Sequence, residues 1–277
     1  MYEEKISMLK ERAKQLRMTA LTMIYEAQSG HPGGAFSAAD IVAALYYSEL
    51  KIDPKDPKWP DRDRFVLSKG HVCPILYSAL GLLGYFPEKE LHTLRKEGSI
   101  LQGHPDMKKC PGIDISTGSL GQGVSCAAGM ALAGKRDKKD YRVFVMAGDG
   151  EMNEGIIWEA MMTANKYALD NFVLIMDNNG LQLDGPCSAV MPPLDMSAKA
   201  AAFGFDVYDI NGHDFEEILS AFDAIRAAKN GKPKFINART VKGKGVDFME
   251  NKVEWHGMAP NAEQYADAMA QLERGQD

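Results

Sequence analysis

The stretch Val143-Phe144-Val145-Met146-Ala147-Gly148-Asp149-Gly150 decides the fold, because an apolar run ends there in a tight acidic turn. A helical pattern follows over about residues 153–169, and a second apolar run, residues 172–176, ends in Asp177-Asn178-Asn179-Gly180-Leu181. This order of strand, turn, helix, strand and turn predicts one βαβ unit with a right-handed crossover. Both turns are then expected at the carboxyl edge of a parallel sheet, where open α/β sheets bind ligands.

Oxygen-bearing groups gather in these two turns. Asp149 offers a hard carboxylate, Asn179 offers a neutral amide oxygen, and the backbone carbonyl of Leu181 offers a third ligand. Magnesium prefers oxygen ligands in octahedral geometry and often shares a carboxylate with the phosphates of a ligand. The glycines allow the backbone to approach a diphosphate closely, and the helix that starts near Asn153 points its positive end the same way. We therefore predict a metal and a diphosphate at this edge.

Composition restricts the class of protein. The chain has 277 residues, of which 45% are apolar and 25% charged, as in a soluble globular protein. Its net charge of −6 argues against nucleic acid and anionic membranes as partners. No apolar run approaches the ~20 residues of a membrane span, and the charged N-terminal segment does not look secretory, so we expect a cytoplasmic location. The four cysteines form no CxxC pair, which predicts neither a zinc site nor a disulfide framework.

The remaining chain alternates helical and strand patterns. Besides the central unit we expect strands at residues 64–67, 205–210 and 235–238, and helices near residues 3–28, 37–50, 74–83, 88–96, 119–134, 198–203, 215–229 and after 261. Ser37 is expected to cap the second helix, with Asp40 at the capping-box position. This alternation predicts an α/β fold, a mostly parallel sheet with helices on both faces, in one domain spanning residues 1–277.

Four of the six histidines lie in turns marked by glycine or proline: His31, His71, His104 and His256. Each alone would be a turn-stabilising histidine, but four in loops favour a polar site, since binding groups concentrate on loops. Histidine also suits acid–base work near neutral pH. We interpret His92, on a helix, and His213, in a turn before a helix, as structural.

Several motifs occur together in the order found in transketolases. They are Ser-Gly-His-Pro-Gly, Arg-Phe-Val-Leu-Ser-Lys-Gly-His, Gly-His-Pro, Thr-Gly-Ser-Leu-Gly-Gln-Gly, the Gly-Asp-Gly to Asn-Asn unit, and Lys-Gly-Lys-Gly followed by Trp-His-Gly. Over about residues 10–260 the chain resembles the N-terminal, diphosphate-binding domain of the transketolase family. The resemblance implies the thiamine diphosphate-binding fold and, as cofactors, thiamine diphosphate with Mg²⁺ or alternatively Ca²⁺ or Mn²⁺.

The resemblance also implies a role for each matching residue. The implied metal ligands are Asp149, Asn179 and the carbonyl of Leu181. The implied backbone and apolar contacts to the cofactor come from Gly118, Leu120 and Gly150, and the implied side-chain contacts from Lys69, His71 and Lys242. Around the ketose and the reacting carbons the resemblance places His31, His104 and His256. Glu154 is similar to a family glutamate that is buried at the subunit interface.

Transketolase polypeptides normally continue into a pyrimidine-binding domain and a C-terminal domain. The glutamate that contacts the aminopyrimidine belongs to a part of the family that this sequence does not contain. The resemblance therefore implies one subunit of a split transketolase, inactive alone, which pairs with a separate pyrimidine-domain chain in an α2β2 heterotetramer. A truncated chain is the alternative.

Other functions stay open at this point. The α subunit of a two-chain 2-oxo acid dehydrogenase shares the cofactor, but the histidine turns fit it less well, and a deoxyxylulose-phosphate synthase fits less well still. A non-catalytic thiamine diphosphate-binding assembly subunit is the alternative from another class. Sugar phosphates of the pentose phosphate pathway are the default substrates, although a transketolase acting on another ketose would have the same motifs here.

Overall fold

A five-stranded parallel sheet forms the centre of the computed structural model, which describes residues 2–275. The strand order is β1 (Arg64–Leu67), β2 (Val143–Gly148), β3 (Phe172–Asn178), β7 (Lys234–Arg239) and β6 (Asp206–Asn211). Every neighbouring pair is parallel, with Phe65 opposite Phe144 and Phe144 opposite Val173. The predicted α/β class is therefore confirmed.

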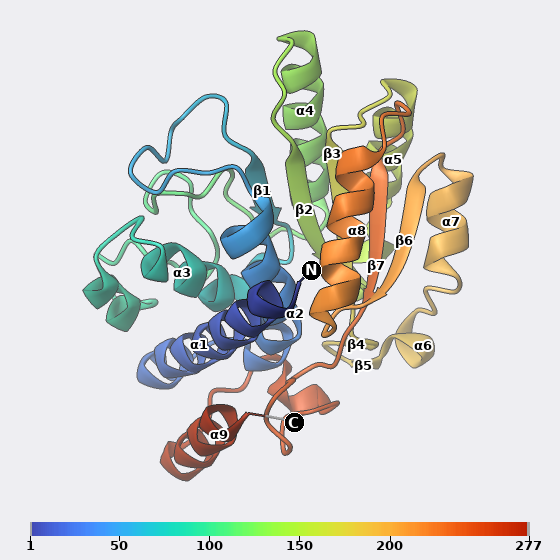
Figure 1. The fold of residues 1–277 in the computed structure, drawn as a ribbon. Coiled ribbons are helices and arrows are strands. Elements are labelled where there is room, and N and C mark those ends of the chain that lie inside the picture. The colour runs from blue at the N-terminus through green and yellow to red at the C-terminus, as the bar shows by residue number, and fades with distance from the viewer. Residues whose placement is uncertain (1, 276–277) are drawn as a thin grey trace.

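Helices cover both faces of the sheet, and two hydrophobic clusters fill the space between the layers (Figure 1). Alternate residues of each strand pack into the two clusters, because successive side chains of a strand point to opposite faces of the sheet. On β2, Phe144 and Met146 join one cluster, whereas Val143 and Val145 join the other. The first cluster is formed with α1 (Glu3–Ala27), α2 (Pro32–Ala44), α3 (Cys73–Leu82) and α8 (Phe215–Ala227), and the second with α4 (Gln122–Arg136), α5 (Gly155–Lys166) and α7 (Met196–Ala202).

Short elements occupy the connections. They are a π-helical turn, η1 (Leu45–Glu49), and the 3-10 turns η2 (Gly70–Val72), η3 (Glu88–Thr93), η4 (Gly150–Asn153) and η5 (Val253–His256). A small antiparallel hairpin of β4 (Leu181–Gln182) and β5 (Gly185–Pro186) precedes α6 (Cys187–Val190). The last helix, α9 (Ala262–Arg274), packs against α1 at the lower end of the view in Figure 1.

The second helix begins five residues earlier than the sequence predicted. Pro32 occupies its first turn, where a fixed φ is favourable and no backbone N–H is missed. Ser37 is consequently inside the helix, and its hydroxyl donates to the carbonyl of Gly34 and to Asp177. Asp40 pairs with Arg17 rather than completing a capping box. The predicted cap at Ser37 was therefore wrong.

Ion pairs of buried carboxylates lie beside the amino end of β2. Glu49, 6% exposed, accepts hydrogen bonds from both Arg142 and Arg226. Arg142 also pairs with Asp63 at 2.6 Å, and its backbone N–H donates to the same carboxylate at 2.7 Å. Glu49 and Asp63 thus each have a guanidinium partner.

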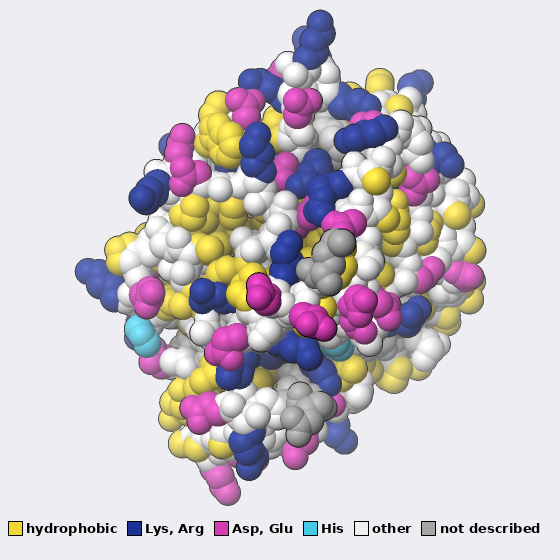
Figure 2. Space-filling model, viewed as in Figure 1, with side chains coloured by type: hydrophobic (Ala, Val, Ile, Leu, Met, Phe, Trp, Pro, Cys, Tyr) yellow, Lys and Arg dark blue, Asp and Glu magenta, His cyan; other side chains and the backbone are white. Residues whose placement is uncertain are grey.

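The surface bears charges of both signs. On the face shown in Figure 2, Lys and Arg side chains alternate with Asp and Glu. Among the helices of residues 2–275, none has the length and apolar character needed to cross a membrane. All four cysteines are free thiols, as predicted.

Candidate active site

The predicted site residues come from turns at one edge of the sheet. Because the five strands are parallel, their carboxyl ends share this edge. His71 lies in the turn after β1, Asp149 follows β2, Asn179 follows β3, and Lys242 follows β7. Groups that are far apart in the chain are thus neighbours here.

The three predicted metal ligands lie in two turns that are bonded to each other. Asp149 is 3% exposed, and its carboxylate accepts the backbone N–H of Gly150 at 2.7 Å and of Gly180 at 2.5 Å. The side-chain oxygen of Asn179 accepts the N–H of Leu181 at 3.1 Å. Burial, with Asp177 nearby, raises the pKa of Asp149.

Asp149 has no ion-pair partner within residues 2–275, so its charge is available to a cation. In the same part of the chain no group of three or more His, Cys, Asp or Glu side chains is arranged to hold a metal. A metal bound here would rely on one carboxylate together with amide and carbonyl oxygens. That donor set leaves coordination positions for oxygens of a ligand, as magnesium sites with phosphates do.

Lys242 connects the turn after β3 to the histidines. Its Nζ lies 3.3 Å from the carbonyl oxygen of Leu181 and 2.8 Å from Nδ1 of His256. Burial, with the charge of Lys69 nearby, lowers the pKa of Lys242 to about 8, so the amine is still protonated at neutral pH. A protonated amine only donates, so Nδ1 of His256 accepts and its Nε2 carries the proton.

Three of the four predicted histidines converge. The ring centroids of His31 and His71 are 5.1 Å apart, those of His31 and His256 are 5.6 Å apart, and those of His71 and His256 are 5.2 Å apart. Burial lowers the pKa of His31 to about 4 and of His256 to about 3, and it holds the pKa of His71 well below its usual range. At neutral pH the cluster therefore consists of neutral imidazoles, each with one donor and one acceptor nitrogen.

His104 lies at the exposed side of this cluster, in the long loop before α4. Its ring packs against Gly118, where φ is +141° and an added Cβ would lie 3.0 Å from the imidazole. Arg95 contacts the same loop, since its Nη2 donates to the carbonyl of Gly103 at 3.3 Å. Its charge contributes to the lowered pKa of both His104 and His31. The sequence did not indicate Arg95, because a lone arginine carries no motif.

Lys69 points into the protein. Its ammonium pairs with Asp177 and donates to the carbonyl of Gly34 at 3.1 Å. Asp177 is fully buried and also accepts from Ser37 and Thr240, and these partners hold its pKa below the usual range. The contact of Lys69 with a cofactor, predicted from the resemblance, stays a prediction.

The other predicted residues lie around the start of α4. Leu120 is half-buried, and the next residue, Gly121, caps that helix with φ +81°. Glu154 is exposed in the isolated chain, and a Cβ on Gly121 would meet its Cβ at 2.8 Å. Whether a second chain buries Glu154 stays a prediction.

The two histidines predicted as structural lie outside the cluster. His213 bonds through Nδ1 to Asp40 at 2.6 Å and accepts the backbone N–H of Val241 at 2.8 Å, which confirms its structural place. His92 is at the surface, where it pairs with Glu26 at 2.9 Å.

Unsatisfied groups at this edge fit a polar ligand. His31 Nδ1 and Gln182 Nε2 are buried and have no hydrogen-bond partner within the described chain. A Cβ on Gly150 would lie 2.9 Å from the Gln182 side chain, so the glycine turn allows a close approach at this point. Buried polar groups normally find partners. The residues present therefore fit an anionic, oxygen-rich group together with a cation beside Asp149.

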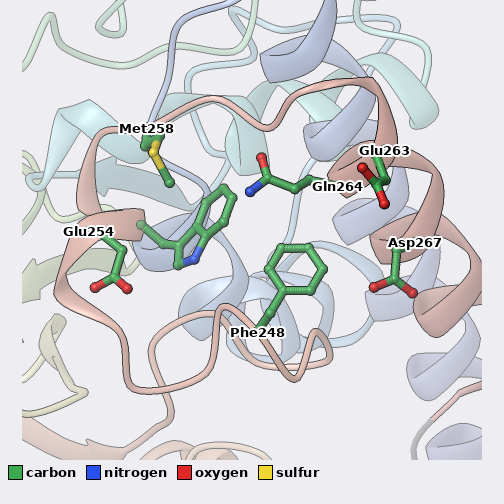
Figure 3. Close-up of a pocket in the computed structure, with 7 residues that line it drawn as sticks. Phe248, Glu254, Met258, Glu263, Gln264 and Asp267 are labelled. Atoms are coloured by element: carbon green, nitrogen blue, oxygen red, sulfur yellow. The ribbon is translucent and has the colours of Figure 1, made fainter.

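Trp255 lines a separate pocket of about 450 Å³. Figure 3 shows this pocket with its lining side chains. Phe248 and Met258 line it with the carboxylates Glu254, Glu263 and Asp267. It contains none of the predicted site residues.

Comparisons with known proteins agree with the geometry. Residues 8–274 match the family model described as "Transketolase, thiamine diphosphate binding domain". The chain is 44% identical to the 6-deoxy-6-sulfo-D-fructose transketolase subunit SqwG of Clostridium sp. (strain MSTE9), covering 99% of both chains. It is 42% identical to an apulose-4-phosphate transketolase subunit of Phocaeicola vulgatus, covering 96% of this chain and 94% of that protein.

A crystal structure of transketolase from Campylobacter jejuni superposes with a TM-score of 0.92 at 37% identity. The match covers 96% of this chain but 43% of that one, so this chain spans less than half of the solved enzyme.

Proposed function

The chain belongs to the transketolase family and matches its thiamine diphosphate-binding domain, and from this premise we propose that it is the cofactor-anchoring subunit of a two-chain transketolase. The proposed reaction moves a two-carbon ketol unit from a ketose donor to an aldose acceptor. The observation that carries the proposal is the convergence of His31, His71 and His256 beside Lys242 and the Asp149 turn.

Bound thiamine diphosphate supplies the carbon nucleophile of the reaction, and this chain supplies its surroundings. Asp149, Asn179 and the carbonyl of Leu181 would hold Mg²⁺, and Ca²⁺ or Mn²⁺ would suit the same oxygen ligands. The Gly118, Leu120 and Gly150 segments would lie against the cofactor, with Lys242 adding positive charge beside its diphosphate. The unpaired charge of Asp149 and the unsatisfied Gln182 amide support this placement.

The neutral histidines would act as hydrogen-bond donors and proton carriers. His256 presents its Nε2 proton because Lys242 occupies the other nitrogen. His31 has a free buried nitrogen that a substrate hydroxyl would satisfy. His104 and Arg95 lie on the exposed side of the cluster, where a sugar would enter. Neutral imidazole changes its protonation more readily than amide or hydroxyl groups do, which suits proton transfer to substrate oxygens.

A separate chain would complete the enzyme. This chain covers 99% and 94% of two relatives that are named as subunits, but 43% of a single-chain transketolase. The pyrimidine-binding domain of the family, with its glutamate, would therefore come from a partner, and an α2β2 assembly would place two such sites at the interfaces. Glu154, exposed in the isolated chain, is a candidate for contact across that interface.

The donor would be a ketose with a terminal anionic group. The two relatives named above are transketolase subunits for 6-deoxy-6-sulfofructose and apulose 4-phosphate, so a specialised ketose competes with the xylulose 5-phosphate of the pentose phosphate pathway. The family assignment favours ketol transfer over the 2-oxo acid chemistry that the sequence left open.

The test is ketol transfer to ribose 5-phosphate with thiamine diphosphate and Mg²⁺. The three donors above are each supplied to the chain alone and to the chain with a candidate pyrimidine-domain partner. Activity only in the mixture is the expected result, and the donor with the highest kcat/KM identifies the substrate. Activity of the chain alone would contradict the two-chain proposal. Cofactor binding in the mixture without transfer from any donor would favour a non-catalytic role.

A further inference from the structure

Glu151 is a buried carboxylate for which neither the motifs nor the comparisons give a role. It lies in η4, two residues after Asp149, and is 3% exposed. Within residues 2–275 it forms no salt bridge, because the ammonium of the nearest cation, Lys69, pairs with Asp177. A buried charge without a counter-ion is costly unless hydrogen bonds satisfy it. Its hydrogen bonds should therefore explain its presence.

Three donors satisfy Glu151, and each comes from a different segment of the site. One carboxylate oxygen accepts the hydroxyl of Ser68 and, at 2.8 Å, the backbone N–H of Gly121. The other oxygen accepts the backbone N–H of Gly148 at 3.1 Å. Ser68 is itself fully buried.

Each donor is adjacent to a residue with a proposed function. Ser68 precedes Lys69 in the turn that leads to His71, Gly121 follows Leu120, and Gly148 precedes Asp149. In the structure these segments are the end of β1, the start of α4 and the end of β2. Glu151 therefore bonds simultaneously to the three segments that form one wall of the site.

The chemistry of the three donors requires a carboxylate. An ionised carboxylate only accepts, through two oxygens, whereas a glutamine amide has one accepting oxygen and one donating nitrogen. In a Glu151→Gln variant the amide nitrogen would face either the N–H of Gly148 or the two donors from Ser68 and Gly121. One segment would then lose its bond and be repelled.

We propose that Glu151 is a positioning residue for the cofactor site, which fixes the Ser68, Gly121 and Gly148 segments relative to one another and thereby places Asp149 and Leu120 for binding. Glu151 is 3% exposed and both of its oxygens accept hydrogen bonds from the chain, so it acts through these segments rather than by touching substrate or cofactor. This inference rests on the proposed thiamine diphosphate site.

The test measures thiamine diphosphate binding with Mg²⁺ by isothermal titration calorimetry, using the full chain alone and mixed with its partner. We expect Glu151→Gln to raise the Kd about 10-fold or more, the usual effect of removing a residue that orients metal ligands. At saturating cofactor, kcat should fall much less than the affinity. Ser68→Ala, which removes one donor and spares the carboxylate, should raise the Kd by a smaller factor.

The matched control is Glu49→Gln at the other end of β2, where a glutamate that is 6% exposed pairs with Arg142 and Arg226. It should lower the melting temperature and leave the Kd unchanged. The proposal would be overturned if Glu151→Gln and Ser68→Ala lowered the melting temperature but bound thiamine diphosphate like the wild type. If Glu151→Gln does not fold, the Kd of Ser68→Ala for thiamine diphosphate alone tests the proposal: a raised Kd supports it and an unchanged Kd overturns it. A wild-type complex that binds no thiamine diphosphate would instead refute the proposed function.

Discussion

The two ends of β2 have opposite electrostatic characters. At the amino end, Glu49 and Asp63 are paired with arginines, and the network is complete within the chain. At the carboxyl end, Asp149 has no ion-pair partner within residues 2–275, and His31 and Gln182 have buried atoms without hydrogen bonds. Satisfied charges stabilise a fold, whereas unsatisfied ones fit a ligand. The comparison therefore predicts that mutations at the two ends will have separable effects on stability and on function.

The largest effect is expected from Asp149→Asn. If Asp149 holds the metal as proposed, losing its carboxylate should lower ketol transfer by the assembled enzyme about 1000-fold, or ~4 kcal/mol of transition-state stabilisation. The melting temperature should fall by less than in the Glu49 variant below. The amide loses one of the two backbone hydrogen bonds, from Gly150 or Gly180, but the change also removes a buried charge that has no ion-pair partner within residues 2–275. Steady-state rates across a Mg²⁺ titration measure the loss of activity, and a thermal melt measures the change in melting temperature. Undiminished activity with unchanged metal dependence would show that the metal assignment is wrong.

The opposite result is expected from Glu49→Ala. Its removal takes away the buried partner of Arg226 and leaves Arg142 with Asp63 alone, so the free energy of unfolding should fall by about 3 kcal/mol. Well below the melting temperature, the KM for thiamine diphosphate should equal that of the wild type. Urea denaturation measures the free energy of unfolding, and steady-state rates at varied thiamine diphosphate concentration measure the KM. A large rise in that KM would mean that the two ends are coupled through the sheet.

A pH effect on stability should come from the histidine cluster. Between pH 6.5 and about 4 the unfolded chain binds protons at His31 that the folded chain does not, because the folded pKa is about 4. Stability should therefore be greatest above pH 6.5 and fall as the pH drops toward 4. Replacing His31 with Asn should flatten this part of the curve, measured by denaturant unfolding at each pH. An unchanged slope would contradict the neutral state assigned to His31.

The smallest effect is expected from His92→Ala. This histidine is 62% exposed in its pairing with Glu26, and exposed pairs contribute roughly 0–1 kcal/mol. Activity and the melting temperature should match those of the wild type within error. The variant is the control for His31→Asn. If both substitutions flattened the dependence of stability on pH to the same extent, the effect would not come from the buried histidine cluster.

The sequence predicted the secondary structure best where a local pattern was complete. The apolar runs before Gly148 and Asp177 appear as β2 and β3, and the first long helix ends within one residue of its expected end. Prediction failed where a competing local signal misled it. Ser37 resembles a helix cap, but Pro32 starts that helix, and the serine hydroxyl bonds to Asp177, 140 residues away.

Sequence by itself determined which functional groups lie in turns, because the motifs around Asp149, Lys242 and the four histidines carry the glycines and prolines that form those turns. Tertiary structure alone decided which of those groups meet. It brought together His31, His71 and His256, turned Lys69 inward to Asp177, and joined three segments through Glu151. The physical reason is that a parallel sheet collects the ends of distant strands at one edge. Burial there sets pKa values and selects hydrogen-bond partners that no local sequence pattern records.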